Sequence, residues 1–96
     1  VKLAGHKKAE ALLRHRIDVF AEANPELDVK SVLASVRALE GDASRRILDV
    51  AKHVLADVIV MGSRGHSTIG ELLLGSVAHK VTMKADIPVM LVPIDR

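Results

Sequence analysis

The stretch from Asp57 to Val77, DVIVMGSRGHSTIGELLLGSV, constrains the fold of this chain more than any other. Its apolar run, VIVM, stops at Gly62, a glycine-rich segment follows, and Ser76 begins a segment of helical periodicity. A buried strand, a glycine loop and a helix start, in that order, commonly form an anion site in α/β proteins. The N–H groups at a helix start lack intrahelical acceptors, and glycine lets them approach a phosphate closely.

Two short apolar segments, residues 57–61 and 89–92, predict strands. Neither alternates apolar with polar residues, which is typical of strands buried on both faces of a parallel sheet. We therefore expect helices above and below that sheet. A further strand is expected within residues 29–39, where the alternation of apolar and polar residues is imperfect.

Apolar residues at three- and four-residue steps predict three helices, at about residues 5–23, 42–56 and 76–85. Asn24-Pro25 ends the first, because proline disfavours helical geometry in the preceding residue. Asp42 follows a turn at Gly41 and is a suitable N-cap for the second. The element order is α-β-α-β-α-β, which indicates a Rossmann-like α/β fold with a parallel sheet and helices on both faces.

Composition excludes several functional classes. The 96 residues suffice for one domain, and the absence of cysteine excludes disulfides and thiolate metal sites. No apolar run approaches the roughly 20 residues of a membrane span. Phe20 is the only aromatic residue, so bases cannot stack on tyrosine or tryptophan. We expect no membrane insertion, no nucleic-acid partner and a cytoplasmic location.

The spacing of the glycines is more specific than their number. Gly62, Gly65 and Gly75, the last followed by Ser76, form the pattern G-x2-G-x9-G-[S/T], ahead of a helix and the strand-like IPVMLVP. In this pattern and in its element order over about residues 42–93, the chain resembles the universal stress protein family. The resemblance implies an adenine nucleotide alpha hydrolase-like fold, a doubly wound sheet of strand order 3-2-1-4-5.

Matched to that fold, the chain begins at the family's second helix. Residues 1–96 then correspond to the C-terminal part of one such domain, without the family's first strand, first helix and second strand. The two absent strands would lie between the strand within 29–39 and the strand at 57–61. We therefore expect these two segments to pair directly, to borrow strands from a partner, or to leave backbone edges unpaired.

The resemblance implies that ATP, with Mg²⁺, lies across the carboxyl ends of the strands. The residues carried over by position are Met61, Gly62, Arg64, Gly65, Gly75, Ser76 and Val77. Met61 and Gly62 would lie near ribose and adenine, and Arg64 and Gly65 would face the phosphates. The residues at the helix start, Gly75 to Val77, would give N–H groups to phosphate oxygens. The family's acidic residue at the end of its first strand, near the nucleotide and its metal, has no counterpart in this chain.

Three functions are weighed. The first is an ATP-binding regulatory module of the stress response, a homodimer joined through the strand Val89–Val92. The second is a dimerisation scaffold of the same fold that binds no nucleotide, in which the glycines serve only to make a turn or to pack beneath a helix. The third is an adenylyl- or phosphoryl-transferring enzyme. We expect no enzyme and no catalytic residue, because no nucleophile–base pair, carboxylate pair or metal cluster can be placed near the glycines.

Overall fold

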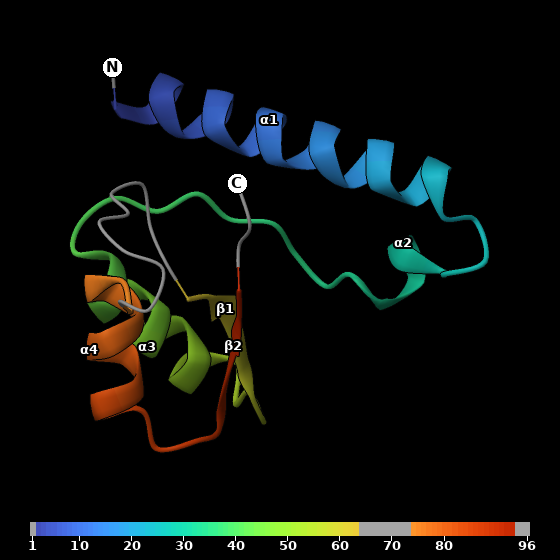
Figure 1. Cartoon of the computed structure of the whole chain (residues 1–96). Helices are drawn as coiled ribbons and strands as arrows, with labels where there is room; N and C mark the ends of the chain where they lie inside the picture. Colours follow the sequence, from blue (N-terminus) through green and yellow to red (C-terminus); the bar gives the residue numbers. More distant parts are fainter. Residues whose placement is uncertain (1, 64–73, 94–96) are drawn as a thin grey trace. The chain divides into compact units, whose positions relative to one another are not determined.

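A computed structural model of the chain describes residues 2–63 and 74–93. They belong to two compact units, Val1–Glu40 and Gly41–Arg96. The elements, in order, are α1 (Lys2–Ala23), α2 (Val29–Val32), α3 (Ala43–His53), β1 (Ile59–Gly62), α4 (Ser76–Lys84) and β2 (Val89–Val92) (Figure 1). The α/β character expected from the sequence is confirmed.

The first unit consists of α1, α2 and the segment that follows them. Asn24 ends α1 as expected, since its side-chain amide donates a hydrogen bond to the Phe20 carbonyl at 2.9 Å. The Nζ atom of Lys30 in α2 lies 2.9 Å from the carboxylate of Asp18 in α1. Both side chains are more than half exposed, at 68% and 51%, so this ion pair contributes little to stability.

The prediction of a strand within residues 29–39 is wrong for the described part of the chain. Its first four residues form the single helical turn α2, closed by the Leu33 N–H, which donates to the Val29 carbonyl at 3.2 Å. The described sheet has two strands, β1 and β2, and residues 33–39 form no strand. The exposed backbone of the rest of this segment can be satisfied by water instead of by a strand.

The second unit begins with a turn at Gly41, whose φ of +116° is one that other residues rarely adopt. Asp42 then takes the N-cap position of α3, as expected, and its carbonyl accepts the Arg46 N–H at 3.0 Å. Its carboxylate does not cap the helix N–H groups; it accepts the Ser44 hydroxyl at 3.1 Å. Ser44 is only 5% exposed, so the carboxylate supplies the partner that a buried hydroxyl requires.

Helix α3 ends in a Schellman motif with leucine in the position usually taken by glycine. The Ala56 N–H donates to the Ala51 carbonyl at 2.9 Å, and the Leu55 N–H donates to the Lys52 carbonyl at 3.2 Å. Leu55 has a φ of +57°, in the left-handed region. Its side chain is 84% exposed, so packing offsets little of this backbone strain.

Leu55→Gly is therefore expected to raise the free energy of unfolding by up to about 1 kcal/mol, because glycine adopts the left-handed conformation without strain. Denaturant unfolding of this variant, beside Leu55→Ala, measures the effect. Alanine keeps the Cβ atom and should give no stabilisation. A glycine variant less stable than the alanine variant would contradict the assignment of strain to this residue.

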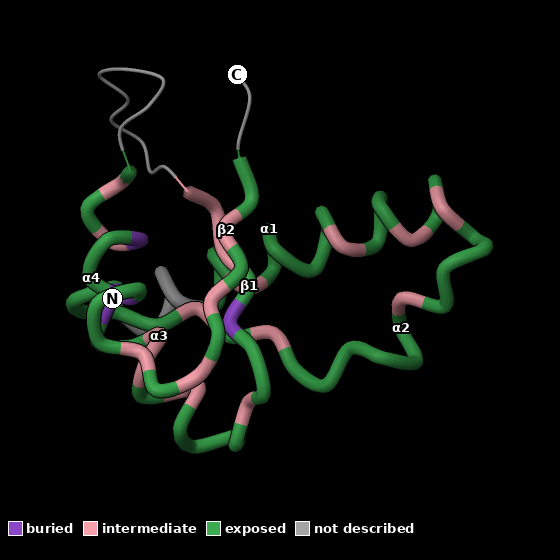
Figure 2. The backbone as a smooth tube through the Cα atoms, turned by 60° about the horizontal axis from the view of Figure 1, so that its bottom comes forward, coloured by how far each residue is buried: buried purple, intermediate pink, exposed green. Residues whose placement is uncertain are grey.

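Strands β1 and β2 form a parallel sheet in which Ile59 pairs with Val89 and Gly62 pairs with Val92. The second strand has the bounds expected, and the first begins and ends later than expected. Helices α3 and α4 lie on one side of this sheet (Figures 1 and 2). The buried described residues are Ser44, Ile59, Ala78 and Val81. The core of this unit therefore lies between the two helices and one face of the sheet.

The prediction that both strands are buried on both faces is wrong for the described residues. Ile59 is 8% exposed, whereas Val58, Val60, Met90 and Val92 are 44%, 59%, 57% and 43% exposed. Side chains alternate along a strand, so these four residues lie on the face opposite to Ile59. No described element of residues 41–96 covers this open sheet face. The apolar strand sequences are thus suited to a second layer that the described part of this unit does not provide.

Candidate nucleotide-binding site

Three segments of the second unit meet at the carboxyl ends of the strands. The Ser63 N–H donates to the Val92 carbonyl at 3.0 Å, which extends the pairing of β1 with β2 by one residue. The Ser63 carbonyl accepts the Gly75 N–H at 2.8 Å, which fastens the start of α4 to the end of β1. In open α/β sheets, ligands bind outside this end of the strands. The local hydrogen bonds therefore assemble the edge at which a ligand is expected.

Among the described residues, no side chain neutralises the positive end of the α4 dipole. Gly75 is its N-cap, no side-chain hydrogen bond caps the helix, and its first turn contains no acidic residue. The His79 N–H donates to the Gly75 carbonyl at 2.9 Å. The N–H groups of Ser76 and Val77 come before this first helical hydrogen bond, so the helix itself offers them no acceptor. Such donors, with the helix dipole behind them, favour an anion.

Backbone conformation does not require glycine at position 75. Its φ of −63° and ψ of 155° are open to every residue type. Gly62, the last residue of β1, is likewise not among the residues of positive φ. What glycine offers at both positions is the absence of a Cβ atom, which permits another group to approach closely. The alternative in which Gly62 serves only to make a turn is therefore disfavoured, whereas the torsions do not test the alternative in which Gly75 packs beneath a helix.

The structure describes five of the seven residues expected to contact ATP: Met61, Gly62, Gly75, Ser76 and Val77. Arg64 and Gly65 lie outside the described residues. The hydrogen bond between Gly75 and Ser63 brings the two segments of this set together. Met61 and Gly62 lie at the end of β1, and the other three lie at the start of α4. The Gly75 N–H was expected to face a phosphate, but here it is used in this bond.

Ser63 was missed by the reasoning from sequence. Its contribution comes from its main-chain N–H and C=O groups, which every residue except proline possesses. No side-chain signal marks such a position. Only the spacing of the flanking glycines pointed to this part of the chain.

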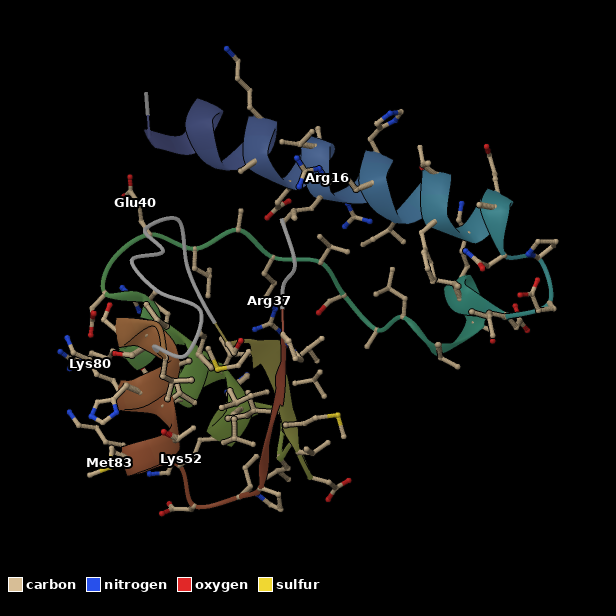
Figure 3. All side chains as sticks on the ribbon, viewed as in Figure 1. Arg16, Arg37, Glu40, Lys52, Lys80 and Met83 are labelled. Carbon is tan, nitrogen blue, oxygen red and sulfur yellow. The ribbon has the colours of Figure 1, made fainter. Side chains whose placement is uncertain are left out.

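Helix α4 has an exposed outer face and a buried inner face. Lys80 and Met83 point away from the sheet (Figure 3), and Met83 is 71% exposed. Ala78 and Val81, on the inner face, are 2% and 0% exposed. The helix is therefore held on the core by its inner residues.

A cavity of about 290 Å³ lies at the opposite end of this unit. Leu48, Leu55 and Ile87 are among the residues that line it, from the ends of α3 and α4 and the approach to β2. It opens near the amino ends of the strands, away from the glycines. It is thus not part of the candidate site.

The amino-acid sequence matches a known protein family. The model of the universal stress protein family matches residues 2–93. The chain belongs to the universal stress protein family. That family has the adenine nucleotide alpha hydrolase-like fold, which confirms the fold class expected from the sequence.

Relatives in this family extend beyond the matched region. Stress response protein NhaX of Bacillus subtilis is 39% identical over 75 residues, which make up 78% of this chain and 45% of the relative. Universal stress protein YxiE of the same organism is 36% identical over 76 residues, 79% of this chain and 51% of the relative. A universal stress protein of Thermus aquaticus is 46% identical over 54 residues, 56% of this chain and 39% of the relative. The chain spans about half the length, or less, of the curated relatives it matches.

Within residues 2–63 and 74–93, no helix has the length and apolar character needed to cross a membrane. In the same ranges, no group of three or more histidine, aspartate or glutamate residues is arranged to hold a metal ion.

Proposed function

We propose that this chain binds ATP, with Mg²⁺, at the carboxyl ends of β1 and β2, and acts as a regulatory module of the stress response. The observation that carries this proposal is the start of α4, which is held beside the end of β1 and which no side chain of the described residues caps. Its N-cap is Gly75, a glycine that the backbone torsions do not require. The N–H groups of Ser76 and Val77 bind phosphate oxygens. Ribose and adenine lie beside Met61 and Gly62.

The described residues suit an anion better than a cation. The first turn of α4 contains no carboxylate that would repel a phosphate, and equally none that would hold Mg²⁺. The first turn of α4 would thus hold the phosphates and not the metal, and Mg²⁺ would accompany the nucleotide to balance the charge of its phosphates. Main-chain N–H groups bind and orient phosphates but do not abstract protons. We accordingly propose a binding function and not an enzymatic one.

The proposed module is a homodimer joined through β2. This strand pairs with β1 along one edge, and no other described strand lies along its second edge. The unpaired N–H and C=O groups of an apolar edge strand favour pairing with another strand. Antiparallel pairing of Val89–Val92 with the same strand of a second copy satisfies these groups in a two-fold dimer. We place this dimer in the cytoplasm, without a nucleic-acid partner.

Relatives named for stress response or universal stress support the cellular role. A scaffold of the same fold that binds no nucleotide is the competing function. It requires the same strand edge but not the uncapped start of α4. Measurement of ATP binding therefore separates the two.

Titration calorimetry of Mg-ATP into the chain tests the proposal, with Gly75→Val as the site variant. The branched side chain occupies the space that a phosphate needs, so affinity should fall by at least about tenfold, as expected for the loss of one charge-assisted hydrogen bond. Ala43→Val is the matched control, because it places the same side chain at the exposed start of α3. It should bind ATP as the unmodified chain does.

The three possible results have separate meanings. Loss of binding in Gly75→Val alone supports the site. Equal binding by all three proteins contradicts the placement of the phosphates at α4. Binding by none contradicts the ATP function and favours the scaffold.

A further inference from the structure

We propose that the main chain of Ser63 is the positioning element of this site: it sets the phosphate-binding N–H groups of α4 against the ends of both strands. The inference rests on the proposed ATP binding and deepens it. It assigns a role to Ser63, which is not one of the residues that define the glycine pattern, through its main-chain N–H and C=O groups.

The first step is that one residue joins all three segments of the edge. The Ser63 carbonyl accepts the Gly75 N–H at 2.8 Å, and the Ser63 N–H donates to the Val92 carbonyl at 3.0 Å. Both distances fall in the normal range of N–H···O hydrogen bonds. Ser63 also follows β1 directly in the chain. The start of α4 is thus hydrogen-bonded to Ser63, which is covalently joined to β1 and hydrogen-bonded to the last residue of β2.

The second step is that fixing Gly75 fixes the donors beside it. The Gly75 carbonyl accepts the His79 N–H at 2.9 Å, so the residue is already part of the helix on that side. Ser76 and Val77 are the next two residues and share the helix geometry. Hydrogen bonds weaken steeply with distance and angle, so the position of this first turn decides how well a phosphate is bound. Ser63 acts on the phosphates only through this placement.

The third step is that the backbone of Ser63, and not its side chain, places the start of α4. This role can be tested by removing the Ser63 N–H group. Proline lacks the N–H that donates to Val92, whereas alanine keeps it and removes only the hydroxyl. Ser63→Pro and Ser63→Ala therefore separate the main-chain role from any role of the side chain. The residue before the substitution is Gly62, which tolerates the restriction that proline places on its neighbour.

The experiment measures the affinities of Mg-ATP and AMP for the unmodified chain and both variants. A positioning role affects the β- and γ-phosphates most, so the preference for ATP over AMP should fall about tenfold in Ser63→Pro, the equivalent of one hydrogen bond. In Ser63→Ala the preference should stay within about twofold of the original. Equal weakening of ATP and AMP in Ser63→Pro would mean a purely structural role and would overturn the inference. An equal fall in the preference for ATP over AMP in Ser63→Pro and Ser63→Ala would also overturn the inference.

Amide hydrogen exchange gives a second readout that does not depend on a variant that may not fold. In the unmodified chain, ATP should slow exchange of the Gly75 and Ser63 N–H groups about tenfold or more, and AMP should slow it less. No slowing with ATP bound would overturn the inference. If the unmodified chain binds neither nucleotide, the proposed function itself fails. That outcome is distinct, because in the others the unmodified chain binds ATP.

Discussion

Val81→Asp is expected to unfold residues 41–96. Val81 is 0% exposed in the interior of α4, and the buried residues Ala78 and Ile59 belong to the same core. An unpaired carboxylate in such a place costs several kcal/mol. The total stability of a small domain is only about 5–15 kcal/mol, and a two-stranded sheet under two helices lies near the lower end. Circular dichroism and denaturant unfolding should show loss of the cooperative transition.

The matched control for this prediction is Met83→Asp. Met83 lies two residues away in the same helix but is 71% exposed. This exposed substitution is expected to lower stability by about 1 kcal/mol or less, because its carboxylate lies near the C-terminal end of the helix dipole. If Val81→Asp and Met83→Asp were equally stable, the interior of α4 would not be the core of this unit.

Gly75→Asp is expected to raise stability and to abolish ATP binding at the same time. Aspartate is a preferred N-cap, and the φ of −63° and ψ of 155° at this position suit it. Its carboxylate would accept the N–H groups of the first turn and complement the helix dipole, for a gain of about 0.3–1 kcal/mol. The same carboxylate would take the donors proposed for phosphate and would repel its charge. ATP affinity should therefore fall by about a hundredfold or more, as for the loss of charge-assisted hydrogen bonds.

Gly75→Asn serves as the matched variant, since asparagine caps a helix with the same shape but no charge. It should give a similar gain in stability and a smaller loss of ATP affinity. Thermal unfolding and titration calorimetry on the same samples measure both quantities. A Gly75→Asp protein that is more stable yet binds ATP normally would exclude the start of α4 as the phosphate site.

Local patterns predicted most of the second unit correctly. The strand Val89–Val92 has the bounds expected from its apolar run, and Asp42 and Gly75 flank the two helices near their predicted starts. These elements are governed by nearby residues: caps, turn glycines and helical periodicity. Such signals can be read from a short stretch of sequence.

The failures concern features that depend on distant partners. Residues 29–39 have an apolar composition suited to a strand, yet a strand needs a neighbour, and the composition of the segment does not supply one. The apolar runs of β1 and β2 predict burial on both faces, but composition indicates only what a face is suited to contact. The strand pairing of residues 29–39 and the covering of the sheet faces both depend on residues outside the segments concerned.

The candidate site was partly predictable for the same reason. Gly62 and Gly75 were identified because their spacing is a sequence pattern, and the structure brings their two segments together. Arg64 and Gly65 lie outside the described residues, so their expected contacts with phosphate stay predictions. Ser63 could not be found from sequence, because a main-chain hydrogen bond leaves the side chain free to vary.

The open sheet face also bears on how the surroundings act on this unit. Val58, Val60, Met90 and Val92 retain between 43% and 59% of their exposure, on a surface whose side chains offer water no hydrogen-bonding group. Solvents act on such a surface selectively: sulfate and other excluded salts favour its burial, whereas urea solvates it. Cooling weakens the same driving force, because it is largely entropic near room temperature. A layer that packs on this face is therefore bound most strongly in warm water that contains sulfate or another excluded salt.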